Sequence, residues 1–554
     1  MIKNCYKITG LFTLILFMFT SCSKKPDILF TNGIIYSLDD DKMYESIAVK
    51  DGKIFDLGST KELTEKYKDA NKFDFKNHIV LPGFIDCEGS IIDFSQNLFS
   101  IVHLNNVDNI SKLKNVLTEK LNKTDESNWI LGTGWNFEKF SENEIMEIDR
   151  YFLDSISSKH MLCILDSTGT VLICNSNVIN ELKITNKTQS TPEGEIEVDE
   201  NGELTGIFYD NAVKLVYEKS PELSREKLKK AIESGSNELL KYGITEIHDR
   251  NLGKDAINLI KELIDSNKFP IKIHCILTGD DEAFEEYLKK GIEINYGNKL
   301  TVRAVTVDYD GLFQNGTALM TDDYSKGSKN IPYIDDNKVE SIMRKALENK
   351  FQFTIKATGD KAIENVLNIC EKVIKSDNFQ DHRTIIEEVE FTNQNDILRL
   401  KNLNIIPKII PEICLEDLEL LRSNNSNKNI IKKTALWNSI IKTSGKLISG
   451  TNFPINNINP FVQIYFLVSG KLDSANILIN TDERITVNEA VNTFTKWAAY
   501  SGFEENSKGV LKIGSQADFI VISDDVFKID INKIPYINII STIINGIVTY
   551  NSLK

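Results

Sequence analysis

The ten residues LPGFIDCEGS, from Leu81 to Ser90, decide how the rest of the chain is interpreted. An apolar run from Ile79 to Leu81 is followed by a Pro-Gly step and by a second apolar step that leads into Asp86. This pattern indicates buried strand structure interrupted by a turn. Glu88, Gly89 and Ser90 follow directly, so polar side chains stand where the second step ends.

Downstream of this stretch, short apolar runs alternate with helical patterns. The runs WILGTG from Trp129, GITEIHD from Gly243 and IKIHCIL from Ile271 are examples of expected strands. Alternation of this kind is typical of βα units and a parallel sheet. We therefore predict a (β/α)8 TIM barrel over residues 81–500, with a β-hairpin insertion near 190–210 around Asn201-Gly202.

Both ends of the chain carry hairpin signals. Asn32-Gly33 and Asp51-Gly52 lie between apolar runs near the start, and Asn545-Gly546 does so near the end. Such dipeptides suit the positive φ angles of a type I′ turn. Neither end has enough strands for a stable sheet alone, so we expect residues 27–80 and 501–554 to pair into one small composite β-sandwich.

Composition excludes several classes of protein. The 554 residues are 41% hydrophobic and 26% charged, which is enough to bury a core and argues against disorder. The net charge of −15 argues against a nucleic-acid partner, which would favour a basic face.

The N-terminus has the pattern of an export signal. Lys3 and Lys7 precede an apolar run, Ile8 to Phe19, that is too short to span a membrane comfortably. Small residues before Cys22 resemble a bacterial lipobox. We predict a lipoprotein signal peptide at 1–21, lipid attachment at Cys22 and a tether over 22–26. The mature protein would be a membrane-anchored lipoprotein of a bacterial cell envelope.

Neither the cysteines nor the histidines form a metal-binding motif. No CxxC spacing occurs among the eight cysteines, which are expected to be mainly buried thiols. The six histidines show no HxH, HxxxH or HExxH spacing. His248 ends a predicted strand and could face the barrel mouth, and His274 is expected to be packed and hydrogen-bonded.

The ordered set of motifs resembles the amidohydrolase superfamily. LFTNGIIYSLDDDKMYESIAVKDGKIFDLGS, HIVLPGFID, GSQADFIVI and INGIVTYN frame the chain as in that superfamily. WILGTGW, EIEVDENGELTGIF, IKATGDKAIENVL and RTIIEEVEF are similar to the branch that contains N-substituted formamide deformylases. The resemblance implies a barrel enzyme in which zinc or another divalent metal activates water and polarises an amide carbonyl.

This chain departs from the family at every position where the resemblance implies a metal ligand or a proton acceptor. Carried over residue by residue, those positions hold Glu88, Ser90, Thr170, Thr306, Lys356, Glu388 and Asn452. We therefore predict no metal cofactor and no catalytic residue. An all-oxygen site for Ca²⁺ or Mg²⁺ built on Glu88 and Glu388 is the alternative.

Lys356 is expected to take over the charge role of the absent cation. Glu88, Lys356 and Glu388 should converge at the C-terminal mouth of the barrel, where Lys356 would pair with one of the two acids. Buried acids without a partner would cost several kcal/mol, so a cation among them is physically required. A lysine paired in this way stays protonated and is a poor base.

Three functions are compatible with these residues. The first is a catalytically degenerate protein that binds a small molecule or a protein partner. The second is an active hydrolase of amide or formamide carbon–nitrogen bonds with a non-standard metal site. The third is a glycan or peptide binder whose cleft is lined by Trp129, Trp135 and Phe137.

Overall fold

The computed structural model describes residues 25–552 except 41, 127, 189–193, 218, 220–222, 323, 325–330, 424–427 and 473–478. The predicted signal peptide, Cys22 and the start of the predicted tether lie outside the described residues. Among the described residues, no helix combines the length and the apolar character needed to cross a membrane.

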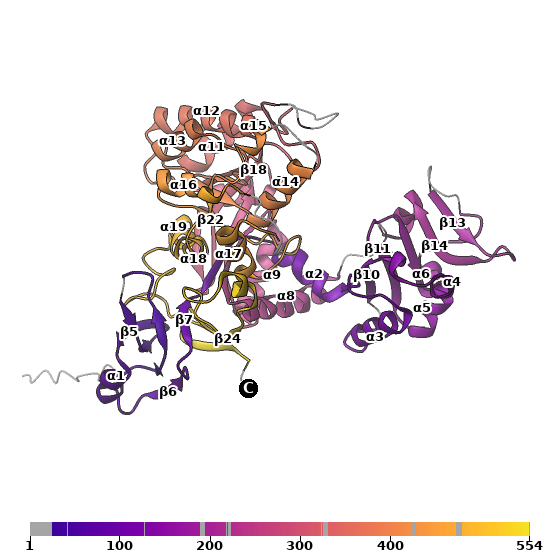
Figure 1. Ribbon diagram of the computed structural model, residues 1–554, viewed down its shortest axis with the longest axis horizontal. Coiled ribbons are helices and arrows are strands. Elements are labelled where there is room, and N and C mark those ends of the chain that lie inside the picture. Colours follow the sequence, from indigo (N-terminus) through magenta and orange to yellow (C-terminus); the bar gives the residue numbers. More distant parts are fainter. Residues whose placement is uncertain are drawn as a thin grey trace, which may run out of the picture.

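A parallel eight-stranded barrel forms the centre of the molecule (Figure 1). Gly89 pairs in parallel with Phe453, which brings the first barrel strand against the last. The predicted barrel is therefore confirmed. In chain order its strands are β8 (Phe84–Gly89), β15 (Ile244–Arg250), β16 (Lys272–Thr278), β18 (Leu300–Asp308), β19 (Gln352–Lys356), β20 (Ile385–Glu387), β21 (Ile406–Ile409) and β22 (Ile448–Ser449).

Amphipathic helices connect these strands and cover the outside of the barrel. On α8 the residues Ala231, Ile232 and Leu239 fall on one face and are buried. The covering helices are α2 (Ile91–Ser100), α8 (Arg225–Leu239), α9 (Lys254–Asp265), α10 (Glu282–Lys290), α11 (Asp336–Glu348), α12 (Asp360–Asp377), α13 (Gln394–Asn402), α14 (Pro411–Ser423), α15 (Lys428–Ile431), α16 (Trp437–Ser444), α17 (Pro460–Ser469), α18 (Val487–Thr493) and α19 (Lys496–Ser501).

Both chain ends contribute to two packed sheets beside the barrel, as predicted. One sheet has the order β5-β4-β1-β6, and the other has the order β25-β24-β23-β7-β2-β3. Phe30 of the first sheet packs edge-on against Phe519 of the second, with ring centroids 5.0 Å apart. The strands are β1 (Ile28–Thr31), β2 (Ile34–Tyr36), β3 (Met43–Tyr44), β4 (Ser46–Lys50), β5 (Lys53–Gly58), β6 (Asn71–Asp74), β7 (Ile79–Pro82), β23 (Phe519–Ile522), β24 (Ile539–Ile544) and β25 (Ile547–Asn551), with helix α1 (Thr60–Lys66) packed beside β1.

Two of the three terminal turn predictions are confirmed and one is wrong. Asp51-Gly52 joins β4 to β5, and Asn545-Gly546 joins β24 to β25; all four residues have positive φ. Asn32 also has a positive φ of 57°, but β1 and β2 belong to different sheets. Asn32-Gly33 therefore passes the chain from one sheet to the other instead of closing a hairpin.

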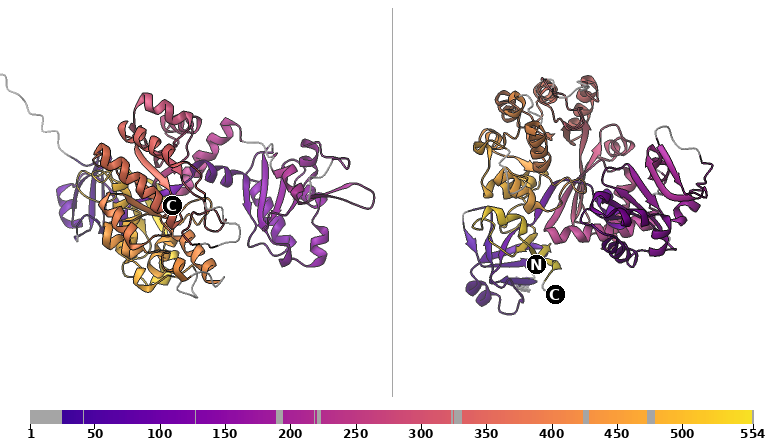
Figure 2. Two further views of the ribbon diagram at one scale, coloured as in Figure 1. Left: turned by 90° about the horizontal axis from the view of Figure 1, so that it is seen from above. Right: turned by 45° about the vertical axis from the view of Figure 1, so that its right-hand side comes forward.

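The insertion is much larger than the predicted hairpin. The hairpin exists as β13 (Gly194–Val198) and β14 (Leu204–Asp210), but it is one edge of a six-stranded sheet. The expected strand WILGTG and the similar apolar run MLCILDS from Met161 form β10 (Trp129–Trp135) and β11 (Met161–Asp166) of this sheet. This sheet stands to one side of the barrel (Figure 2). The remaining strands of this insertion sheet are β9 (Ile101–His103) and β12 (Val171–Cys174). The helices of the insertion are α3 (Ile110–Leu121), α4 (Glu142–Glu147), α5 (Arg150–Ile156), α6 (Ser176–Glu181) and α7 (Lys214–Tyr217).

Layers of side chains from alternate strand residues fill the barrel. On β15 the residues Glu246, His248 and Arg250 are spaced two apart, so they point to the same side. Glu246 pairs with Lys508 near the start of the strand, and Arg250 ends the strand at the C-terminal mouth. The polar groups at that mouth are therefore held by a packed interior beneath them.

Candidate functional site

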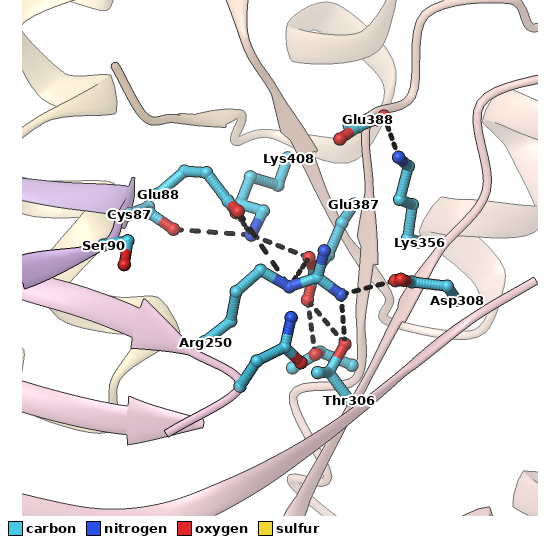
Figure 3. Close-up of polar contacts among 12 residues, drawn as sticks. Cys87, Glu88, Ser90, Arg250, Thr306, Asp308, Lys356, Glu387, Glu388 and Lys408 are labelled. Carbon is cyan, nitrogen blue, oxygen red and sulfur yellow. Dashed lines mark hydrogen bonds and ion pairs between the residues drawn. The ribbon is translucent and has the colours of Figure 1, made fainter. Parts of the chain in front are cut away.

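Lys408 holds two buried carboxylates together at the C-terminal mouth of the barrel (Figure 3). Its ammonium group contacts the Glu88 carboxylate and lies 3.0 Å from Oε2 of Glu387. It also lies 3.4 Å from the carbonyl oxygen of Cys87. The Lys408 side chain is only 2% exposed, so these contacts replace nearly all of its hydration.

Arg250 is the second cation of this cluster and contacts residues from three other strands. Its guanidinium donates to Oδ1 of Asp308 at 2.7 Å and to Oγ1 of Thr306 at 2.9 Å. Its Nε lies 3.4 Å from Oε2 of Glu387 and 3.9 Å from Oε1 of Glu88. We call Glu88, Arg250, Glu387 and Lys408 the central ion network.

Lys356 and Glu388 form a separate pair beside the central ion network. Nζ of Lys356 lies 3.2 Å from Oε2 of Glu388, and the Thr358 hydroxyl donates to the same oxygen at 3.0 Å. The predicted contact between Lys356 and an acid is therefore present. Glu388 has a φ of 56°, in the left-handed region that a residue with a long side chain seldom adopts.

The charges of both clusters are fixed by their neighbours. Burial lowers the pKa of Lys408, but Glu387 and Glu88 outweigh it and raise the pKa above its ordinary value. Burial likewise lowers the pKa of Lys356, but the carboxylates of Glu388 and Asp308 outweigh burial and raise this pKa above its ordinary value. Both lysines therefore stay protonated at neutral pH and cannot act as bases.

The pKa values of the two network acids are shifted in opposite directions, although burial raises both. Burial raises the pKa of Glu387, but Arg250 and Lys408 outweigh it and bring the pKa below its ordinary 4.5. Glu88 shares the same cations, but burial outweighs them and raises its pKa. Glu387 is therefore the firmly ionised acid of the central ion network.

The free energy of unfolding should depend on pH through Glu387. A carboxylate with a lowered folded pKa stabilises the protein above the unfolded value, and this contribution is lost as pH falls through the folded pKa. We expect the stability difference between wild type and Glu387→Gln to shrink by about 2–3 kcal/mol between pH 6 and pH 3. Urea unfolding at each pH measures it. A difference that stays constant with pH would contradict the lowered pKa.

A pocket of about 240 Å³ opens above these clusters. It is lined by charged, amide and apolar side chains that come from several strand ends and from α14. The lining residues are Glu88, Arg250, Leu312, Gln314, Lys356, Glu388, Ile413, Glu416, Asp417, Asn452, Ile455 and Asn456. Glu88, Lys356 and Glu388 therefore converge here, as the sequence predicted.

The other predicted site residues are divided between this pocket and other places. Asn452 lines the pocket, and its backbone N–H donates to the Glu88 carbonyl at 2.8 Å. Thr306 lies beneath the pocket and accepts a hydrogen bond from Arg250. Ser90 caps α2 and donates to Asp93 at 2.8 Å. Thr170 lies in the insertion sheet, where it borders a different hollow, so the structure does not bring it to the barrel mouth.

Two buried histidines lie deeper in the barrel. The rings of His248 and His274 are 4.8 Å apart, one layer below Arg250, so His248 does not face the mouth. His274 is packed as predicted, but neither of its ring nitrogens has a hydrogen-bond partner among the described residues. Burial lowers the pKa of His274 to about 4, so the ring is neutral.

The sequence profile of the amidohydrolase family matches residues 73–550. The chain belongs to the amidohydrolase family. This match includes all eight barrel strands, the insertion sheet and the sandwich strands β7, β23 and β24 with nearly all of β25, so the resemblance predicted from the motifs is confirmed over most of the described chain.

Several known proteins are similar over almost their full length. The Bacillus subtilis protein YtcJ, named as a suspected amidohydrolase, is 24% identical over 535 residues, which cover 94% of this chain and 98% of YtcJ. The N-substituted formamide deformylase of Arthrobacter pascens is 20% identical over 547 residues, which cover 95% and 98%. An uncharacterized metal-dependent hydrolase from Pyrococcus furiosus aligns with a TM-score of 0.70 at 20% identity, over 90% of this chain and 100% of that one. This last likeness shows the fold alone.

The side chains at the barrel mouth do not fit the divalent metal that an amidohydrolase fold implies. A metal needs several deprotonated ligands that converge on one point. Here the point between Glu88 and Glu387 is taken by the Lys408 ammonium, and Arg250 lies beside it. Across the part of the chain that the structure describes, no group of three or more His, Cys, Asp or Glu side chains is arranged to hold a metal ion.

Arg250, Glu387 and Lys408 were missed in the sequence. Lys408 interrupts the apolar run NIIPKIIPE, where a strand buried in a barrel has no room for a solvated lysine. Arg250 directly follows the expected strand GITEIHD. A charged residue in or just after a buried barrel strand was therefore the signal that could have identified both cations.

Proposed function

We propose that this amidohydrolase-family protein is catalytically degenerate and binds a small ligand in the pocket above the central ion network. The observation that carries the proposal is Lys408, whose protonated ammonium contacts both Glu88 and Glu387. A fixed cation can offset the two acids, but it cannot bind a water molecule as a Lewis acid and lower its pKa.

The remaining lining residues do not supply the missing chemistry. Asn452 occupies the position where the family resemblance implies a proton acceptor, and its Nδ2 donates to Asn456 at 2.8 Å. Lys356 is held protonated by Glu388. The pocket has a volume of about 240 Å³ and a partly polar lining, and ligand binding requires both features.

Active hydrolysis of an amide or formamide bond is the second candidate. It is supported by the name of one similar protein, the Arthrobacter N-substituted formamide deformylase. In that case the pocket would bind its metal through residues other than the central ion network.

Metal content and turnover measured together separate the two candidates. We expect protein purified without chelators to contain less than about 0.1 divalent metal ion per chain. We also expect no hydrolysis of N-substituted formamides or simple amides above the buffer rate, with or without added Zn²⁺, because nothing ionises the attacking water. The Arthrobacter deformylase, assayed in parallel, is the positive control. Stoichiometric metal together with zinc-dependent turnover would establish the hydrolase instead.

A further inference from the structure

One wall of the pocket is acidic and lacks the cations that neutralise the opposite wall. Helix α14 contributes Glu416 and Asp417, and the chain just after β20 contributes Glu388, which lies on the same side. Glu390 lies behind this wall and is fully buried. We call Glu388, Glu390, Glu416 and Asp417 the acidic wall.

The cations that line or underlie the pocket are already paired with carboxylates, and of these cations Lys356 contacts a member of the acidic wall, Glu388. Lys408 and Arg250 contact Glu88, Glu387 and Asp308, and Lys356 contacts Glu388. Within the described residues, no salt bridge reaches Glu390, Glu416 or Asp417. Apart from the pair of Lys356 and Glu388, the acidic wall therefore has no described cation to offset its carboxylates when they are ionised.

Asp417 is the residue that marks this wall as a binding surface. It is 1% exposed and lines the pocket, and its polar neighbours are the Glu390 carboxyl group and the Gln314 amide, neither of which is a cation. Within the described residues, neither of its carboxyl oxygens has a hydrogen bond of normal length. Gln314, the nearby amide, donates to Glu416 at 3.3 Å. Among the residues that the structure describes, both carboxyl oxygens of Glu390 are also without a hydrogen bond of normal length, and this carboxyl group adjoins that of Asp417. Buried acids in this state destabilise a fold, so each one calls for a physical explanation.

Apolar residues complete the pocket. Leu312, Ile413 and Ile455 line it together with the acidic wall. Its volume of about 240 Å³ corresponds to roughly eight water molecules at ~30 Å³ each, enough for a ligand of similar heavy-atom number. The lining thus combines a short apolar surface with a carboxylate that no described cation contacts.

We propose that the ligand is a small organic cation, an alkylammonium or amidinium compound, whose charged nitrogen donates to Asp417 and whose carbon chain packs on the apolar residues. This inference rests on the proposed ligand-binding function and specifies its chemical class. The ligand supplies the cation that the acidic wall lacks, and the charge-assisted hydrogen bond makes binding specific for charge.

Three matched probes test the charge preference. Pentylammonium, pentan-1-ol and pentanoate have similar length and differ in charge, and ligand-detected NMR titration gives their affinities. We expect pentylammonium to bind wild type at least about tenfold more tightly than pentan-1-ol, and pentanoate to bind more weakly than either. Asp417→Asn should reduce the ratio of the first two affinities to about one.

Glu419→Gln is the matched control. Glu419 lies on the same helix, is exposed and does not line the pocket, so removing its charge should leave the tenfold ratio unchanged. Without ligand, Asp417→Asn should unfold at the same temperature as wild type or higher, because it removes one of two adjoining buried acids that no described cation offsets. If Asp417→Asn fails to fold, Glu416→Gln serves as the second variant. It removes one carboxylate of the acidic wall, so it should lower the affinity ratio of pentylammonium to pentan-1-ol without abolishing it.

The outcomes separate this inference from the proposed function. Equal affinities for the three probes, unchanged in Asp417→Asn, would overturn the cation preference and leave ligand binding by the pocket in place. Stabilisation by CaCl₂ alone, abolished in Asp417→Asn, would assign the wall to an inorganic cation and overturn the inference. Zinc-dependent turnover, measured separately, would overturn the proposed function.

Discussion

Replacing Lys408 with methionine should lower the free energy of unfolding by about 3–5 kcal/mol. Methionine keeps most of the side-chain volume but leaves Glu88 and Glu387 facing each other without the ammonium that contacts both. Removing one partner of a buried ion pair costs more than the pair itself contributes, because a buried charge remains without compensation. Urea unfolding at pH 7 measures the change.

Lys375→Met is the control for the loss of a lysine. Lys375 forms an exposed pair with Glu371 one helical turn away on α12, and such pairs contribute less than about 0.5 kcal/mol. The triple variant Lys408→Met, Glu88→Gln and Glu387→Gln should recover most of the lost stability, since it removes the uncompensated charges as well. Wild-type stability in the single variant would show that solvent screens the two acids and that Lys408 is not their counter-charge.

The contact between Lys356 and Glu388 was predictable because it depends on strand order. Lys356 ends β19, Glu388 directly follows β20, and these two strands are adjacent in the sheet. The carboxyl ends of parallel strands meet at one edge, so charged residues at the ends of successive strands are brought close together. The sequence pattern alone carries this information.

The partner of Glu88 was not predictable in the same way. Lys356 and Lys408 are both lysines on barrel strands, but Lys408 lies deeper and reaches Glu88 and Glu387. Glu387 and Glu388 are adjacent in sequence, and the left-handed φ of Glu388 directs the two carboxylates to different cations. Neither side-chain depth nor a positive φ on glutamate can be inferred from hydrophobic periodicity.

The extent of the insertion illustrates a second limit. WILGTG and MLCILDS have the same short apolar character as the barrel strands, but they pair with each other as β10 and β11 in the separate sheet. Periodicity identifies a strand without identifying its sheet. The Asn32-Gly33 turn shows the same limit. Its positive φ at Asn32 was predicted correctly, but the two strands that it joins belong to different sheets.

Replacing Gly450 with alanine should destabilise the protein by about 3 kcal/mol or more. Gly450 directly follows the last barrel strand and packs against the first one. A Cβ atom at Gly450 would lie 2.4 Å from the backbone nitrogen of Glu88 and 2.3 Å from its Cβ. Backbone atoms cannot rotate away from such an overlap, so the two strands would have to separate where the barrel closes. Chemical unfolding measures the loss.

Gly253→Ala separates this steric effect from the general effect of replacing a glycine. At Gly253, before α9, φ is −74° and the nearest atom to an added Cβ is 3.9 Å away, so alanine fits without strain. Gly253 is the N-cap of α9, where alanine is a poorer cap, so we expect a loss of no more than about 1 kcal/mol there. Because separation of the strands would also displace Glu88 from Lys408, Gly450→Ala and Lys408→Met should be less than additive in the double variant. Full additivity would mean that the closure of the barrel and the central ion network are energetically independent.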